Sequence, residues 1–448
     1  MQAADVCVTR PTAEAHQKSI WHPIVTILGV AIVAAAVANF VLFAVFLDRT
    51  MILRPFTDMI DWIDRYLQTR QHGDVLGYLW APHNEHHLVF IRALTALDVA
   101  AFKASGVPFV VSATLATIVT AFIIYVEFRR TLTGPLRVLA WLSPMLLLNT
   151  AVAVDCSAPT NSVYPISVVF LVGTLVLFSS AAEFAPHTGA KRTVALVTGL
   201  LASLSNALGL LIWPAMLWLA WRGGASKRWL IGVGAIGIGY GLFYVWTLHG
   251  QTSTIDLGHL PKMADYLLAY LGLPFSRVPE FGLAARALGA ALLAVAAIAI
   301  LCDAILRGPA TRLHLIGIGL IIVALGAALL TAIGRVDQEQ EVQVPFRYGI
   351  FVALLHIGLL ALVLPFFARL ATTPQLQITL LGAGTAFAGM LLLMQIVSGR
   401  HAMVVSTSIT NAIARYEETR VLEPGMERLF SNLPQADRVL TEIHNLGN

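Results

Sequence analysis

The sequence of 448 residues contains few charged side chains, and this scarcity decides the class of the protein. Asp, Glu, Lys and Arg together make up 12% of the chain, whereas hydrophobic residues make up 57% and the mean hydropathy is +0.76. A soluble globular domain carries about 25% charged residues. The composition therefore excludes an ordinary soluble protein and predicts a multi-pass membrane protein.

Cysteine is also scarce, with only Cys7, Cys156 and Cys302 in the chain. On the topology described below, these residues fall on the inner side, on the outer side and inside a span, so no two can form a disulfide. Basic residues are scattered singly and the net charge is only +4, which argues against a nucleic-acid partner. The chain also lacks a P-loop and a G-x-G-x-x-G between a strand and a helix, so no nucleotide site is predicted.

Long apolar runs are abundant and predict an all-α polytopic fold with about eleven transmembrane helices, since about 20 apolar residues cross a bilayer. Two runs are too short to cross alone and predict a shallow hairpin whose tip points to the outer side, where its irregular backbone must line a cavity or pack in protein. The two short runs are 193–205 and 207–221. The other nine lie at 24–47, 108–126, 138–154, 163–182, 229–248, 283–301, 313–333, 349–367 and 376–397.

The distribution of Lys and Arg predicts the orientation. With the N-terminus in the cytoplasm, the inner segments hold thirteen basic and five acidic residues, and the outer segments hold sixteen basic and twenty acidic residues. This bias satisfies the positive-inside rule. We therefore expect an integral protein of the inner (cytoplasmic) membrane with an extracytoplasmic C-terminus. Residues 1–397 form the transmembrane domain, with a first outer loop at 48–107, and residues 398–448 form a short helical tail that docks on the outer loops.

Part of the first outer loop is apolar but is predicted to lie at the interface rather than to cross the membrane. The segment 88–102 is only fifteen residues long and carries Arg92 and Asp98. One charge at the bilayer centre costs roughly 2.5 to 3.5 kcal/mol. We therefore expect an interfacial helix at this position.

A second helix in this loop carries three aspartates. The stretch "RPFTDMIDWIDRYLQ" predicts an amphipathic helix opened by Pro55 and capped by Thr57. Asp58, Asp61 and Asp64 repeat every third residue, so neighbouring carboxylates raise at least one pKa, which suits a general base. The alternative is a solvated face with ordinary pairs to Arg65. The apolar face of the predicted helix consists of Phe56, Ile60, Ile63 and Leu67.

Three histidines follow in "WAPHNEHHLVF", residues 80–90. His83, Asn84 and His86 are candidates for a wall of the site that binds phosphate or hydroxyl groups, and Glu85 is a second candidate base. If a helix begins here, His83 and His86 or His87 share a face, a spacing that can hold zinc, with His72 as a third ligand. The remaining alternative is a polar helix entrance without a specific role. No cofactor other than this possible divalent metal is predicted.

Two arginines end a short outer loop, "GRVDQEQEVQVPFRYG". Arg335 and Arg347 next to the membrane surface suit a clamp for a lipid phosphate, because guanidinium matches phosphate in a bidentate manner. The alternative is that both arginines simply snorkel to the interface.

The predicted organisation resembles that of the GT-C superfamily of membrane glycosyltransferases. It consists of a first span, a long outer loop with acidic residues on a short helix, many further spans and an outward tail. The segments "HNEHHLVFIRAL", "NALGLLIWP", "YLGLPF" and "GR…FRYG" are similar, in this order, to segments of bacterial multi-span proteins with GT-C-like organisation. The resemblance implies a polyprenyl-phosphate sugar as donor, Asp58 or next Asp61 as the base, and Arg335 or Arg347 on the carrier phosphate. The carboxylates here lie three residues apart, whereas many members have adjacent ones.

The resulting hypothesis is a glycosyltransferase that moves a sugar from a polyprenyl-phosphate donor to a glycan or lipid acceptor on the extracytoplasmic face. Its expected partners are this donor, the acceptor and membrane lipids. Two alternatives are a flippase or transporter of lipid-linked glycans, and a glycan polymerase or ligase. A flippase predicts paired ionisable residues near mid-span and an internal repeat, and neither is visible in the sequence. The W-W-D-Y-G signature is absent, so protein N-glycosylation is disfavoured.

Overall fold

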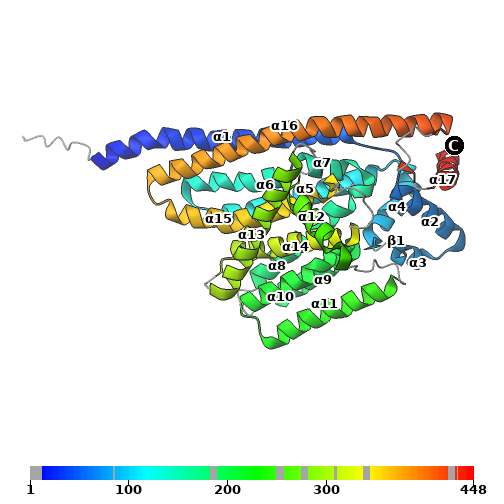
Figure 1. Cartoon of the computed structure of the whole chain (residues 1–448), viewed down its shortest axis with the longest axis horizontal. Coiled ribbons are helices and arrows are strands. Elements are labelled where there is room, and N and C mark those ends of the chain that lie inside the picture. The colour runs from blue at the N-terminus through cyan, green and yellow to red at the C-terminus, as the bar shows by residue number, and fades with distance from the viewer. Residues whose placement is uncertain are drawn as a thin grey trace, which may run out of the picture.

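The computed structural model describes residues 13–83, 86–181, 189–248, 257–273, 281–306, 310–335, 344–421, 429–430 and 432–447. These residues form an all-α structure with one short β-hairpin (Figure 1). The first half contains α1 Ala13–Thr50, α2 Asp58–His72, α3 Val75–Trp80, β1 Pro82–His83, β2 His86–His87, α4 Val89–Phe102, α5 Val107–Thr131, η1 Gly134–Trp141, α6 Leu142–Leu147, α7 Thr150–Ser157, η2 Pro159–Asn161, α8 Val163–Ala181 and α9 Gly189–Ser205. The second half contains η3 Ala207–Leu211, α10 Ile212–Arg222, α11 Lys227–Thr247, η4 Leu257–His259, α12 Leu260–Leu271, α13 Gly282–Leu306, α14 Arg312–Arg335, η7 Phe346–Tyr348, α15 Gly349–Leu370, α16 Pro374–Thr419 and α17 Leu433–Gly447.

Eight of the described helices are long and apolar enough to cross a membrane, which agrees with the predicted multi-pass protein. A ninth span results if η1, α6 and α7 are taken together as one bent helix. The predicted short runs at 193–205 and 207–221 form α9 and, after η3, α10. The count of eleven requires this pair to enter the bilayer from one side and return, and it stays a prediction. The eight helices are α1, α5, α8, α11, α13, α14, α15 and α16, with η2 leading into α8.

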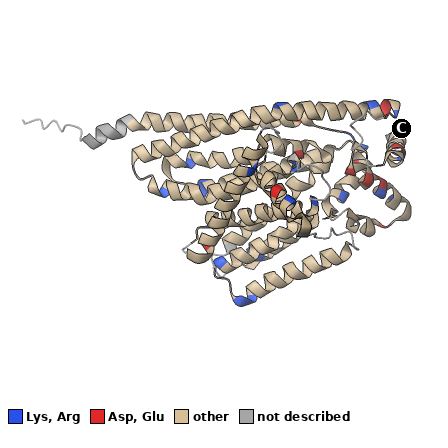
Figure 2. Cartoon of the chain, in the orientation of Figure 1, with Lys and Arg blue, Asp and Glu red and all other residues tan. Residues whose placement is uncertain are grey.

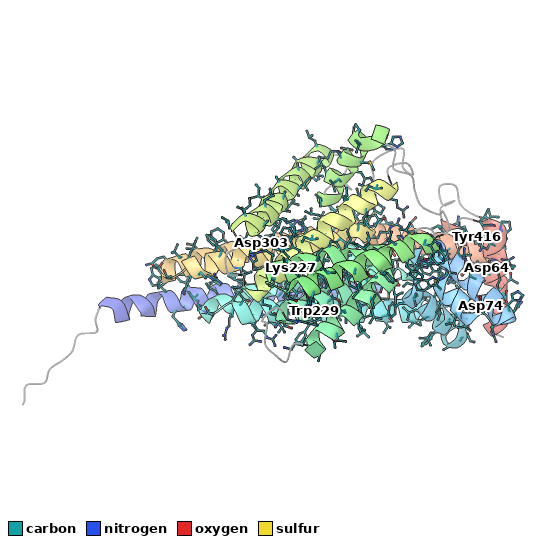
Figure 3. The ribbon with its side chains drawn as sticks, turned by 90° about the horizontal axis from the view of Figure 1, so that it is seen from below. Asp64, Asp74, Lys227, Trp229, Asp303 and Tyr416 are labelled. Atoms are coloured by element: carbon teal, nitrogen blue, oxygen red, sulfur yellow. The ribbon has the colours of Figure 1, made fainter. Side chains whose placement is uncertain are left out.

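Helices α1 and α16 run side by side along one edge of the molecule (Figure 1). They approach closely at Gly399, where an added Cβ would lie 2.2 Å from the ring of Phe46. Farther along, Ser406 donates a hydrogen bond of 2.6 Å to the carbonyl of Thr50. Helix α16 continues unbroken through position 397, where the last span was expected to end, as far as Thr419. The tail therefore begins as an extension of a span. In the view of Figure 3, α13 (yellow-green) stands apart from this pair.

The bent span between α6 and α7 is stabilised by side chains from α1 and α16. The two parts meet at 49°, and the backbone between them leaves the carbonyl of Leu148 without a helical partner. Asn39 of α1 and Gln395 of α16 donate hydrogen bonds to this oxygen at 2.8 and 3.0 Å. Asn149 caps α7 by accepting from the amide of Val152. Buried amides thus satisfy a break that apolar surroundings alone would make costly.

The turn between α9 and η3 depends on a small residue and a cap. An added Cβ at Gly209 would lie 1.9 Å from the carbonyl oxygen of Ala202, so only glycine fits there. Asn206 accepts a hydrogen bond from the amide of Leu208 at 3.0 Å. Asn206, at the tip of this turn, lines a cavity that residues of the first outer loop line as well. The depth of the turn in a membrane stays a prediction.

Ion pairs connect the helices at the end of the bundle away from this cavity. Asp303 of α13 lies 2.8 Å from Arg222 of α10 and 2.8 Å from His314 of α14, and accepts a hydrogen bond of 2.9 Å from Trp218. Figure 2 shows basic residues at this end of several helices and a group of acidic residues on α2 at the other end. The orientation of the chain in a membrane stays a prediction.

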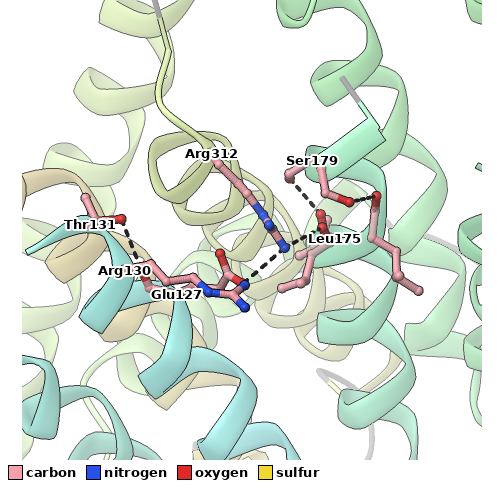
Figure 4. Close-up of polar contacts among 9 residues, drawn as sticks. Glu127, Arg130, Thr131, Leu175, Ser179 and Arg312 are labelled. Atoms are coloured by element: carbon pink, nitrogen blue, oxygen red, sulfur yellow. Dashed lines mark hydrogen bonds and ion pairs between the residues drawn. The ribbon is translucent and has the colours of Figure 1, made fainter. Parts of the chain in front are cut away.

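A second pair of this kind links α5 to α14. Glu127 lies 3.0 Å from Arg312 and 3.1 Å from Arg130 (Figure 4). Arg312 also donates a hydrogen bond of 3.4 Å to the carbonyl of Val176 in α8. The buried carboxylates at this end thus have cationic partners on neighbouring helices.

The first outer loop folds into α2, α3, a two-stranded hairpin and α4. Helix α4 covers the segment that was expected at the interface, but Arg92 and Asp98 are both fully buried in protein rather than exposed at a membrane surface. Asp98 accepts hydrogen bonds from the amide of Gly106 and the hydroxyl of Ser105, and burial raises its pKa to about 6. The guanidinium of Arg92 packs over the aromatic ring of Tyr78, 5.1 Å from the ring centre.

Candidate functional site

A cavity of about 940 Å³ opens between the first outer loop and the ends of the bundle helices. It is lined by parts of α1, α2, the hairpin, α7, the α9–η3 turn, α14, η7 and α16. Six of the eight predicted site residues line it, namely Asp58, Asp61, His83, His86, Arg335 and Arg347. The remaining two, Asn84 and Glu85, lie outside the described residues. Folding therefore brings together side chains that are up to 289 positions apart, as Asp58 and Arg347 are in the sequence.

Helix α2 holds Asp58 and Asp61 toward the cavity. Its predicted apolar face is buried, and Met59 and Trp62 are buried as well. Thr57 occupies the cap position, but its side chain makes no capping hydrogen bond, so this part of the prediction is wrong. Its backbone has φ 46°, which is unusual for a β-branched residue, and its amide donates a hydrogen bond of 2.8 Å to the carbonyl of Leu429.

The carboxylate of Asp58 lies among positive groups. Its Oδ2 is 3.6 Å from Nε2 of His83, an ion-pair distance rather than a hydrogen bond. Burial raises the pKa of Asp58, but His83, Arg347 and Arg335 outweigh burial, so the pKa lies below its usual value. The rise predicted for at least one pKa of this repeat is therefore not found at Asp58. Its carboxylate is ionised at neutral pH.

Asp64 faces away from the other two aspartates. It is 7% exposed and accepts hydrogen bonds of 2.7 Å to both oxygens from Arg438 and one of 2.9 Å from Gln435. The repeat of three aspartates therefore combines two roles. Asp58 and Asp61 line the cavity, and Asp64 makes a structural ion pair with the C-terminal segment.

The histidine segment forms a β-hairpin and not the start of a helix. His83 is paired with His86 in antiparallel register, and both line the cavity. His87 is held on the other side by the carbonyl of Trp80 at 2.7 Å and the hydroxyl of Thr247 at 2.8 Å. Arg65 and Arg92 each donate to the carbonyl of Pro82 at 3.3 Å. Contacts from α2, α4 and α11 thus stabilise a hairpin that local sequence does not specify.

The helical spacing assumed for a zinc site at these histidines is therefore not present. Within the ranges that the structure describes, no three His, Cys, Asp or Glu side chains are grouped so that they could hold a metal ion. Burial and the nearby charges of His83, Arg335 and Arg347 lower the pKa of His86 to about 4. His86 is neutral at pH 7, and its ring has one nitrogen that can donate and one that can accept a hydrogen bond.

Arg335 and Arg347 approach the cavity from the end of α14 and from η7. The Nε of Arg347 is buried and has no hydrogen-bond partner among the described residues. A buried N–H without a partner costs free energy, roughly 1 to 3 kcal/mol, and more for a charged group. The guanidinium is thus prepared to donate to an anion that enters the cavity.

Sequence reasoning missed several residues of the cavity wall. Tyr164, Asn161 and Asn206 line it, as does His401 of the extended α16. Asp155 of α7 was missed as well. It is fully buried in the helix that forms one wall, neither of its oxygens has a partner among the described residues, and the charge of Arg347 acts on it. The polar run after the third apolar segment, "DCSAPTN", was the available signal.

Comparison of the chain with protein-family models, with curated protein sequences and with solved structures finds no match. The functional interpretation therefore depends on the cavity itself.

Proposed function

We propose that the protein is a membrane glycosyltransferase that transfers a sugar from a polyprenyl-phosphate donor to a hydroxyl of a glycan or lipid acceptor at the extracytoplasmic face. One observation carries this proposal. A single cavity combines an ionised carboxylate, Asp58, with the guanidinium of Arg347, whose buried Nε–H has no hydrogen-bond partner among the described residues. A carboxylate can accept the proton of an attacking hydroxyl, and a guanidinium can stabilise a departing phosphate.

In the proposed reaction, the acceptor oxygen attacks the anomeric carbon while its proton passes to Asp58. The bond between that carbon and the phosphate oxygen breaks, and its electron pair stays on the phosphate. Arg347 and Arg335 stabilise the added negative charge, so the leaving group needs no proton. Attack opposite the leaving group inverts the anomeric configuration. Asp61 lies one turn further along the same helix face, where it suits binding of acceptor hydroxyls.

Binding of the donor should also change the pKa of Asp58. The two arginines contribute to the low pKa of Asp58 in the free protein. A phosphate between them adds negative charge and offsets their effect, so the pKa of Asp58 rises toward its ordinary value. The carboxylate then becomes a stronger base only when the donor is present.

The test is profiling of lipid-linked glycans in cells that carry only the wild-type or a variant gene. We expect glycans from cells with Asp58→Asn to lack one sugar. The rate of sugar transfer should fall at least about a hundredfold, since a general base contributes roughly that factor to the rate. Asp61→Asn should be affected less. The matched control is Asp74→Asn, because Asp74 caps α3 in the same loop, outside the cavity wall, and asparagine also caps helices.

A transferase variant lacks one sugar, whereas a flippase variant accumulates the complete precursor on the cytoplasmic side. Full transfer by Asp58→Asn would rule out this base. Accumulation of the complete precursor inside the cell would instead support the transporter alternative.

A further inference from the structure

The C-terminal segment, defined here as residues 429–430 and α17, contacts the helix that carries Asp58. Helix α17 packs on α2 at the end of the molecule where the extended α16 terminates (Figure 1). Asp64 of α2 and Tyr416 of α16 are seen together at this end in Figure 3. We propose that this segment is a positioning element of the cavity, which holds α2 so that Asp58 faces His83 and the two arginines.

The first contact is at the residue before Asp58. The carbonyl of Leu429 accepts the hydrogen bond of 2.8 Å from the amide of Thr57. Thr57 has φ 46° and ψ −131°, a conformation that a β-branched residue adopts only when its surroundings impose it. The C-terminal segment thus stabilises the backbone conformation from which α2 starts.

The second contact lies two turns further along α2. Arg438 binds both oxygens of Asp64 at 2.7 Å, and Gln435 adds a hydrogen bond of 2.9 Å. Contacts at Thr57 and at Asp64 together restrict both the position of α2 and its rotation about its axis. Rotation of α2 would move Asp58 and Asp61 relative to His83, whereas Arg335 and Arg347 belong to other elements.

The segment is itself attached to α16, which forms part of the cavity wall. Leu429 and Phe430 are buried, and the ring of Phe430 lies 4.7 Å from that of Tyr416. The hydroxyl of Tyr416 donates to Asp437 at 2.9 Å. Ala436, Val439 and Leu440 are buried as well. The C-terminal segment therefore connects α16 to the helix that carries the carboxylate.

The assignment of Asp58 as a base rests on the proposed function, but the positioning of Asp58 can be tested without it. The experiment records histidine-selective ¹⁵N NMR spectra of the full chain in nanodiscs. The signal of His83 is identified by its loss in His83→Gln. Asp58→Asn removes the neighbouring carboxylate, and the resulting displacement of the His83 signal defines the effect of losing this contact.

We expect Arg438→Gln and Asp64→Asn to displace the His83 signal in the same direction as Asp58→Asn. The signal of His87, held by Trp80 and Thr247, should stay in place. The control is Arg49→Gln, which removes an exposed charge of α1 whose ion pair is with its neighbour Asp48, outside α2 and the C-terminal segment. The exchanged pair Asp64→Arg with Arg438→Asp should restore the wild-type His83 signal.

A parallel measurement separates this proposal from the proposed function. Binding of decaprenyl phosphate should be the same in Arg438→Gln as in the wild type, because the arginines are not moved. If the wild type fails to bind this probe, the proposed function is in error while the NMR result still stands. An unchanged His83 signal in both Arg438→Gln and Asp64→Asn would overturn the positioning role.

Discussion

At the scale of single residues, aspartates of the first outer loop lie in three different environments. Asp58 is ionised beside His83, Asp64 is paired with Arg438, and Asp98 has a raised pKa of about 6 because it is buried. The sequence shows three aspartates in a regular repeat on α2. Their surroundings, and not their spacing, separate the candidate base from the structural carboxylate.

The protonation of a single residue, His86, should make anion binding depend on pH. The pKa of His86 is about 4 in the free protein, and a phosphate beside Arg335 and Arg347 should raise it by favouring the imidazolium. The complex then binds more protons than the free protein, so affinity rises as the pH falls. If the bound pKa is about 6, the affinity at pH 5 is about tenfold higher than at pH 7.

The measurement is titration calorimetry with decaprenyl phosphate between pH 5 and pH 7. Protonation of the phosphate itself also changes affinity in this range, and His86→Gln serves as the control because it retains only that effect. The prediction fails if the wild type and His86→Gln show the same pH dependence.

At the scale of elements, breaks in helices are stabilised by polar side chains from distant segments. The bend between α6 and α7 depends on Asn39 and Gln395, and the turn after α9 depends on Asn206 and Gly209. Asn39, Gln395 and Gly209 stand in apolar runs, where a hydropathy pattern gives them no special weight. Asn206 stands between the two short runs, at the predicted hairpin tip. Their function is visible only next to the backbone groups that they satisfy.

Replacement of Gln395 tests the bend. Gln395→Leu leaves the carbonyl of Leu148 with one donor fewer. It also removes one of the two acceptors of the Thr150 hydroxyl, the side-chain oxygen of Gln395 at 3.0 Å, and leaves the backbone carbonyl of Gln395 at 3.1 Å. We expect a loss of about 1 to 3 kcal/mol in stability, seen as a lower melting temperature in detergent. Gln375→Leu, at an exposed position near the start of the same helix, should leave the melting temperature nearly unchanged. Equal melting temperatures for both variants would contradict the role of Gln395.

At the scale of the whole molecule, the two ends of the bundle differ in the environment of their charges. At the cavity end, Asp58 lies 3.6 Å from His83 in an open cavity, whereas the other end pairs Asp303 with Arg222 and His314 at 2.8 Å. Among the described residues, the Nε atoms of Arg222, Arg312 and Arg347 are all buried without a hydrogen-bond partner, but only Arg347 lines the cavity, where a ligand could reach it. This asymmetry is the main structural support for placing the function at the cavity end.

The paired end predicts a large effect on stability. Arg222→Met leaves the buried carboxylate of Asp303 without its guanidinium and should cost about 3 to 5 kcal/mol. Arg130→Met is the control, because Arg130 is mostly exposed and Glu127 retains Arg312, so its loss should cost at most about 1 kcal/mol. Thermal unfolding in nanodiscs measures both, and a smaller loss for Arg222→Met than for Arg130→Met would contradict this assignment.

The sequence by itself determined the membrane class, the approximate positions of the spans and the part of the chain in which the candidate site lies. These features depend on local hydropathy and on the distribution of charge, which need no knowledge of distant contacts. It also indicated six side chains that line the cavity, because polar residues stand out in an apolar chain.

Only the tertiary structure decided how these side chains are arranged. The hairpin at His83 and His86 exists because α2, α4 and α11 hold its backbone and His87 in place, although the local sequence was compatible with a helix. The contact of α17 with α2 likewise joins segments far apart in the chain, and the burial of Asp155 follows from the packing of several helices around it. Such contacts are set by packing between elements, a property that no local pattern of residues contains.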